Sequence, residues 1–590
     1  MRSPYRLLIL AVLFLLQVPV FSQISVNSND DFYEYAQVWE IRGLVKTLPP
    51  VRPYSLNSIK NILQQVIKRG NRKDVELAIS YWNEISGKPM GVEFEAYGKG
   101  KFSANSKGNG SDVEQDTDKL LWGRFALAGD GYIFPDLLSI GYDLGVLART
   151  KEDERPFLPY YSNSSYNAIQ DPATLGPLYG YIDMNAAASV GTSEFFAQLG
   201  LNRTGYGPFP KRGLALNETA YHSGNISYNI VRDNFTFTQQ YSAIGATRSY
   251  DGTGLEPEKF IAFHALEYRF TPKFSASYYE SIVFGRRFDL SYFLPVPFMA
   301  AQGLGGNSDN TQLGLLFKYK PFDNLLWATD LFVDDFDVNA LVKGSLDSKN
   351  RFALQTGLIY APENSFCRKV SLVYTAVAPY TYSHWEYADS KTDTIVPDMY
   401  NYQNYTNNGI PIGTAYAPNS DSIEFSLDFK PSQNLRIGVG TSLMRHGNIA
   451  ESLDTDEAAE YLAAASGTYA TDGSIFEHSM FSGGDHVESA WNALNFLNQE
   501  NKMYVVQAKF DVDWTIARTA FGSFTLNLGN VFQYTHNKGV DSHLYPGGSL
   551  GKNASSDDKK KAVKAAQEKW KRGFRDELAD YVFIGFTYKF

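Results

Sequence analysis

The chain contains a single cysteine, Cys367, among its 590 residues. One cysteine excludes an internal disulfide framework and any metal site built from several thiolates. Histidine is also scarce, and the eight histidines stand apart along the chain rather than at metal-ligand spacing. The sequence therefore predicts no bound metal and no cofactor.

Long apolar runs are missing as well. Outside the N-terminus, no stretch is apolar over the roughly 20 residues that a membrane-spanning helix needs. The N-terminal run, Leu7 to Leu16, is too short; Arg2 and Arg6 precede it and a small-residue motif ending at Ser22 follows. This arrangement is typical of a secretory signal peptide. We expect residues 1–22 to direct export, and no helix to hold the protein in a membrane.

Basic residues are fewer than acidic ones, and the usual catalytic motifs are missing. The formal charge is −10, which makes the chain a poor candidate for binding nucleic acid. The sequence has no Gly-x-Ser-x-Gly elbow, no His-Glu-x-x-His motif and no phosphate loop. Asp334 and Asp335 are adjacent and would point to opposite faces of a strand, whereas Asp511 and Asp513 would continue one face. We therefore expect no enzymatic activity.

Aromatic residues are abundant, with 39 Tyr and 40 Phe, although the mean hydropathy is only −0.29. Soluble domains rarely combine these two properties. A membrane β-barrel combines them because lipid-facing and lumen-facing residues alternate and aromatic girdles mark the two interfaces. The composition therefore favours an outer-membrane barrel.

Alternation with a period of two residues is clearest at the C-terminus. There, one phase is apolar and largely aromatic: Val582, Ile584, Phe586, Tyr588 and Phe590. Successive side chains of a strand point to opposite faces, so this pattern predicts a strand with one apolar wall. In a soluble protein that wall would face a core. A terminal Phe590 resembles the closing strand of bacterial outer-membrane barrels, which implies the barrel-assembly machinery as a partner.

Short and long connections alternate along the rest of the chain. Residues 232–234, 271–273, 321–324, 431–434 and 518–519 are expected as short turns, and the long polar loops are expected near 103–118, 150–177, 201–221, 241–258, 285–308, 384–420, 446–501 and 538–579. This is the connection pattern of an outer-membrane barrel, with short periplasmic turns and long outer loops. We predict an all-β fold, a transmembrane antiparallel β-barrel of about 18 strands over residues 91–590. A shift of the alternation around His264 to Phe270 leaves the strand count open by two.

Two regions depart from the strand pattern. Residues 23–90 carry three helical patterns: one around Phe32 to Leu44, one from Ser55 to Gly70 and one from Lys73 to Ser86. They predict a periplasmic α-helical plug, or else a simple helical cap. Helices are also expected within the long loops, at 454–465, 484–498 and 557–579; they could be solvated loop helices, a partner site or a lid over the outer mouth.

Several motifs, in this order, resemble the capsule-assembly Wzi-type outer-membrane proteins. They are Asn202 to Gly207, Phe263 to Phe270, Tyr279 to Gly285, Phe293 to Phe298, Asp309 to Gly314, Leu331 to Phe336, Asn408 to Gly413 and Met444 to Gly447. The resemblance implies an eighteen-stranded barrel plugged at its periplasmic end, and a lectin-like role in holding surface polysaccharide. The long loops 446–501 and 538–579 have no counterpart in the family, so the ligand could differ.

A polysaccharide site at the outer mouth needs aromatic rings that stack on sugars, and charged or amide groups that contact hydroxyls and carboxylates. The loops and strand ends supply the candidates Arg203, Tyr206, Arg212, His222, Arg286, Arg287, Asp334 and Asp335. The aromatic members could equally belong to the outer girdle. Outer-membrane lipid and surface polysaccharide are the expected partners. The alternative function is that of a porin or solute channel, because a barrel of this size can hold an aqueous lumen.

Overall fold

The computed structural model describes residues 24–86, 90–106, 113–162, 172–246, 258–306, 309–335, 350–363, 365–384, 403–447, 496–499, 501–519, 522–538, 555, 557–558, 561 and 574–590. The predicted signal peptide lies outside these residues. So do the helices expected at 454–465 and at most of 484–498 and 557–579.

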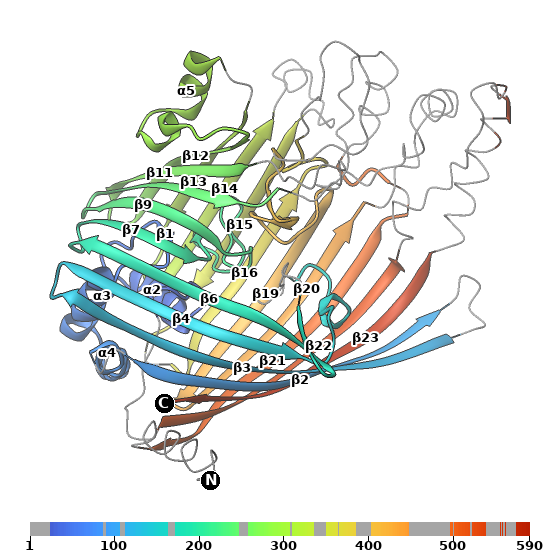
Figure 1. The fold of residues 1–590 in the computed structure, drawn as a ribbon, viewed down its shortest axis with the longest axis horizontal. Helices are drawn as coiled ribbons and strands as arrows, with labels where there is room; N and C mark the ends of the chain where they lie inside the picture. Colours follow the sequence, from blue (N-terminus) through green and yellow to red (C-terminus); the bar gives the residue numbers. More distant parts are fainter. Residues whose placement is uncertain are drawn as a thin grey trace, which may run out of the picture.

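Within the described part of the chain, eighteen antiparallel strands close into one barrel (Figure 1). They are β2 (Gly91–Ser106), β3 (Val113–Phe134), β4 (Leu138–Arg149), β6 (Leu178–Gly191), β7 (Phe195–Asn202), β9 (Ser223–Val231), β10 (Phe235–Ile244), β11 (Lys259–Thr271), β12 (Phe274–Gly285), β13 (Asn310–Tyr319), β14 (Leu325–Asp335), β15 (Arg351–Tyr360), β16 (Cys367–Val377), β19 (Ser420–Ser432), β20 (Leu435–His446), β21 (Met503–Thr519), β22 (Gly522–Lys538) and β23 (Arg575–Lys589). A short strand, β5 (Ala173–Leu175), pairs with β6. The predicted fold class is confirmed.

The barrel closes where the last strand meets the first. β23 pairs with β22 on one side and with β2 on the other. Beyond the strand end, the amide of Phe590 donates to the Val92 carbonyl at 2.8 Å, and the amide of Val92 returns a hydrogen bond at 2.9 Å. Closure leaves no unpaired strand edge at this seam, which is what a hydrocarbon surrounding requires.

The outer wall of the barrel carries the apolar phase of the strands. On β23, Ile584 and Phe586 are exposed, whereas Tyr581 of the other phase is buried. The same outward exposure recurs around the barrel, for example at Phe94, Leu121, Ile182, Leu199, Leu266, Leu315, Trp327, Leu358, Leu372, Phe425, Val506 and Phe510. This is the face that contacts lipid in a membrane barrel.

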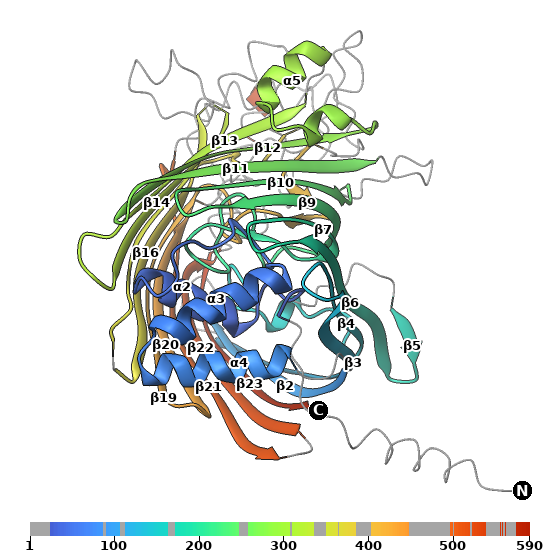
Figure 2. The same ribbon diagram turned by 90° about the vertical axis from the view of Figure 1, so that its left-hand side faces the viewer.

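Three helices of the N-terminal segment lie inside the ring of strands (Figure 2): α2 (Asp31–Ile41), α3 (Leu56–Arg69) and α4 (Arg72–Ile85). Each begins at a side-chain cap, from Asp30, Ser55 and Asn71 respectively. Their shared core includes Phe32, Trp39, Leu56, Ile59, Leu63, Val66 and Ala78, all with no exposed surface. No helix in the described ranges is long and apolar enough to cross a membrane.

The helices contact the end of the barrel that carries the short turns. Glu34 of α2 pairs with Lys369, Lys46 pairs with Asp233 at 2.7 Å, and Arg42 Nε donates to the Ala361 carbonyl at 3.2 Å. Burial raises the pKa of Glu34, but the charges of Lys369 and Arg368 outweigh it and hold that pKa well below its ordinary value. The helical segment therefore plugs the end of the barrel that carries the short turns.

Two expectations about the loops need correction. β2 continues to Ser106 and β3 starts at Val113, so strands extend through most of the segment 103–118 that was expected to be a loop. The charged helix expected up to Ala579 is likewise wrong at its end, because β23 begins at Arg575. Polar composition indicated loop in both places. A strand facing a polar lumen tolerates such side chains: Glu577 is buried beside Lys538, with Lys101 at 3.9 Å.

Candidate functional site

The lumen is filled from the outer side by a loop that folds inward. Residues 203–222, which connect β7 to β9, contain a two-residue strand, β8 (Gly205–Tyr206). It pairs with β1 (Val51–Arg52), which lies between α2 and α3 of the plug. Leu214, Ala215 and Leu216 of this inward loop are buried in the core of the lumen. The loop expected to project outside therefore meets the periplasmic plug inside the barrel.

A second inward segment, residues 403–419, covers the first. It contains the small hairpin of β17 (Thr406–Asn407) and β18 (Ile410–Pro411). The Tyr405 hydroxyl donates to the Ala215 carbonyl at 2.9 Å, and the Asn217 amide donates to the Ile412 carbonyl at 2.9 Å. The Tyr382 hydroxyl, from the connection after β16, donates to the Leu214 carbonyl at 2.8 Å. These hydrogen bonds join the two outer segments into one packed layer.

A buried ion pair links this layer to the plug. Glu218 of the inward loop has no exposed surface, and it binds the guanidinium of Arg52 from β1. Its second oxygen accepts the amide of Lys211 at 3.0 Å, while Arg52 Nη1 donates to the Gly207 carbonyl at 3.1 Å. Both charges are therefore compensated within the protein.

Four of the predicted site residues belong to the inward loop. Arg203 Nε donates to the Ala220 carbonyl at 3.0 Å, and Tyr206 packs edge-on against Tyr279 with ring centroids 5.1 Å apart. Arg212 binds Glu424 of β19 at 2.8 Å. Burial lowers the pKa of His222 to about 4, with a further contribution from the charge of Arg203, so its imidazole is neutral. The contacts of Arg203, Tyr206 and Arg212 hold the loop in the lumen.

The other four predicted residues lie at the outer strand ends. Arg287 binds Asp309 at 3.0 Å, and the buried Asp334 accepts the amide of Tyr382 at 2.8 Å. Arg286 and Asp335 have exposed side chains. The eight candidates therefore do not form one cluster, and Arg286 and Asp335 are the most exposed of the eight.

Several residues that close the lumen carry no signal in the sequence. Glu218, Tyr382 and Tyr405 stand in ordinary polar loop composition, and their partners lie far away in the chain. Lys259 of β11 is a similar case: its ammonium is buried and binds the Asn404 side chain at 2.8 Å and the Thr406 carbonyl at 2.7 Å. Only the folded barrel brings these groups together.

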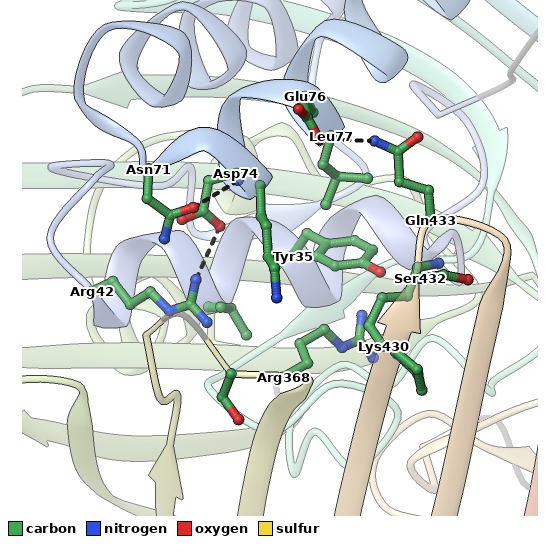
Figure 3. A pocket seen from close by; sticks show the side chains of 14 residues that line it. Tyr35, Arg42, Asn71, Asp74, Glu76, Leu77, Arg368, Lys430, Ser432 and Gln433 are labelled. Atoms are coloured by element: carbon green, nitrogen blue, oxygen red, sulfur yellow. Dashed lines mark hydrogen bonds and ion pairs between the residues drawn. The ribbon is translucent and has the colours of Figure 1, made fainter.

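A cavity of about 250 Å³ lies on the periplasmic side, between the plug and the turns after β15 and β19 (Figure 3). The guanidinium carbon of Arg368 is 4.5 Å from the ring centroid of Tyr35 in this cavity, and the ammonium of Lys430 is 5.9 Å from it. Arg368 is held by both oxygens of Asp428 at 2.6 Å, and Arg42 is held by Asp74 at 2.9 Å. The cavity is thus a seam between plug and barrel, at the short-turn end, whose arginines are already paired.

Comparison with known proteins gives the fold. No protein-family model matches the chain, and no curated protein matches its sequence. Among solved structures, the chain is similar to Wzi of Escherichia coli, an outer-membrane protein involved in group 1 capsule assembly that is described as a carbohydrate-binding β-barrel. The TM-score is 0.51 at 12% identity, over 95% of this chain and 98% of that one. This chain shares the fold of a bacterial outer-membrane barrel.

Two further structures are more distant. OpdL of Pseudomonas aeruginosa has a TM-score of 0.39 and 11% identity, over 85% of this chain and 99% of that one. OpdQ of the same organism has a TM-score of 0.37 and 10% identity, over 85% of this chain and 98% of that one. Both likenesses are too loose to bear on function.

Proposed function

We propose that this protein is a non-conducting outer-membrane barrel that binds surface polysaccharide at its outer mouth and helps to hold it on the cell, without catalysing a reaction. The observation that carries the proposal is the filled lumen. A porin needs a continuous aqueous path, whereas here the plug, the inward loop and the segment 403–419 lie across the lumen and are joined by hydrogen bonds and a buried ion pair.

The outer rim offers the chemistry for such a ligand. Arg286 follows β12 directly, its backbone has the left-handed φ of 61°, and its amide donates to the Glu258 carbonyl at 2.9 Å. The side chain is thus anchored at its base and exposed at its end. A guanidinium in this position can bind the carboxylate of an acidic sugar, and Asp335 can accept sugar hydroxyls. Wzi, with the same fold, is described as carbohydrate-binding.

Bilayer recordings separate this function from that of a channel. The purified protein is expected to give no steady conductance, because the inward segments remain packed in the lumen. Steady large openings of the unmodified protein would favour the porin alternative instead.

Polysaccharide retention tests the binding itself. Cells that carry Arg286→Glu should retain a smaller amount of acidic surface polysaccharide than cells with the unmodified protein. The substitution places a negative charge at the rim, which repels the negatively charged polysaccharide. Arg232→Glu is the matched control: it makes the same charge change in an exposed pair with Glu194, on the periplasmic turn. Equal retention in a deletion strain and in the unmodified strain would contradict the proposal.

A further inference from the structure

Three polar side chains occupy the outer wall of the barrel, where the strands otherwise present apolar residues to lipid. Gln239 of β10, His264 of β11 and Glu280 of β12 stand side by side, as the register pairs Gln239 with His264 and His264 with Glu280. Their outward direction follows from the period of two, because Leu266, Tyr268 and Tyr278 of the same phases are exposed. Bare contact with hydrocarbon would be costly for all three.

This polar patch is covered by the connection between β12 and β13. We name residues 290–306 the outer strap; it contains η2 (Leu290–Phe293) and α5 (Phe298–Gly305). Figure 2 shows α5 outside the ring of strands, above β11 to β13, whereas α2, α3 and α4 lie inside it. Figure 1 shows the same placement from the side. The strap therefore lies against the outer face of the wall instead of closing the mouth.

The strap contacts each member of the polar patch. The amide of Phe298 donates to Glu280 at 2.6 Å, and Gln239 donates to the Tyr292 carbonyl at 2.8 Å. The Phe298 ring lies 4.2 Å from the imidazole of His264, which in turn contacts Glu280 at 3.2 Å. As a result, the three polar side chains keep 0%, 7% and 1% of their surface exposed, in chain order.

The other side of the strap is apolar and has no partner within the described residues. The run from 290 to 306 contains no Asp, Glu, Lys or Arg. Four of its large side chains are exposed: Leu290, Leu294, Met299 and Leu304, by 65%, 55%, 58% and 91%. A contiguous apolar surface of this kind marks contact with a partner or a membrane.

We infer that the outer strap is embedded in the external leaflet of the outer membrane, with acyl chains as its partner. Two observations favour lipid over a protein. The strap lies on the flank of the barrel wall, which is itself immersed in the bilayer. Leu266, Tyr268 and Phe270, which follow the covered His264 along β11, are exposed on the same face of the wall. The strap replaces the lipid-facing surface that the polar patch interrupts, and it lets the wall carry buried polar residues within the bilayer.

Spin-label accessibility in phosphatidylcholine vesicles tests this placement on the full chain. Cys367 is replaced by Ser, and single cysteines are placed at Leu294 and Leu304, at Leu266 as the lipid-facing reference and at Asn83 of α4 as the exposed aqueous reference. Single exposed positions are chosen so that folding is not disturbed.

Labels at Leu294 and Leu304 are expected to collide with oxygen and to be shielded from a water-soluble nickel chelate, as at Leu266. The oxygen-to-nickel ratio should exceed that at Asn83 by about tenfold or more, because hydrocarbon excludes polar solutes. A ratio like that of Asn83 would place the strap in water and overturn the inference. Shielding from both reagents would indicate a protein partner, such as a second copy of the chain, and would overturn it equally.

Discussion

The ring of Tyr97 on β2 fills the space above Gly585 on β23, at the seam where the barrel closes. The two residues face each other in the register, and a Cβ built on Gly585 would lie 1.8 Å from the ring. Tyr97 is stacked between Trp122 and Phe583, with centroids 4.2 Å and 4.9 Å away, and its hydroxyl lies 2.9 Å from that of Thr587. The packing of the closing seam therefore requires glycine at position 585, because any Cβ there would collide with the Tyr97 ring.

Gly585→Ala should weaken the seam. The added methyl group must displace the Tyr97 ring from its stack, and overpacking of this kind costs about 1–3 kcal/mol. We expect a lower urea midpoint and less of the compact form that resists SDS without heating. Gly224→Ala is the control, because a Cβ there meets nothing within 4 Å. An equal effect of the two substitutions would show that the ring contact is not the cause.

Glu218→Gln should loosen the plug from the inward loop. The substitution leaves Arg52 as a buried charge without its counter-ion, and breaking a buried pair in this way costs about 3–5 kcal/mol. Amides of residues 205–218 are expected to exchange faster with deuterium, and brief conductance events should appear in bilayers. Glu194→Gln, in an exposed pair with Arg232, should cost about 0–1 kcal/mol and change neither readout.

Docking of α2 should weaken in acid. The pKa of Glu34 is lowered in the folded protein, so its contribution is complete above the ordinary carboxyl value of about 4.3 and is lost as the pH falls toward the lowered pKa. Exchange at α2, corrected for the intrinsic rate, should therefore rise below about pH 4. Glu34→Gln should raise the exchange rate of the α2 amides already at pH 7 and remove most of its pH dependence. An unchanged acid response in that variant would assign the effect to other carboxylates.

The inward loop should become slightly less stable in each of two variants, Tyr382→Phe and Tyr405→Phe. Each removes one hydroxyl donor to a carbonyl of Leu214 or Ala215, worth about 1 kcal/mol. Because the two acceptors are adjacent, the double variant is expected to deviate from additivity. Exchange at 212–217 measures the effect. Tyr534→Phe removes a comparable but exposed hydrogen bond, to Asp576 at 2.9 Å, and should leave these amides unchanged.

The alternation around His264 shows where pattern reading misleads. The mixture of polar and apolar residues predicted a shift of the strand phase between His264 and Phe270. The register of β11 with β12 does shift at the end of this range, between Arg269 and Thr271, but it is regular from Lys259 to Arg269 and so does not shift at His264 itself. The strap covers the outward His264, and the inward loop covers the lumen-facing Phe263 through Tyr206. Both faces are buried, so neither residue follows the simple rule of apolar outside and polar inside.

The barrel and the helical plug are predictable from the sequence because both depend on local periodicity. A period of two gives each strand a lipid face and a lumen face, and the caps Ser55 and Asn71 set the helix starts. The paths of the long connections, in contrast, are visible only in the folded chain. One folds into the lumen to meet Arg52, and another folds over the wall to cover Glu280. Those choices depend on contacts between residues far apart in the chain, which no local pattern records.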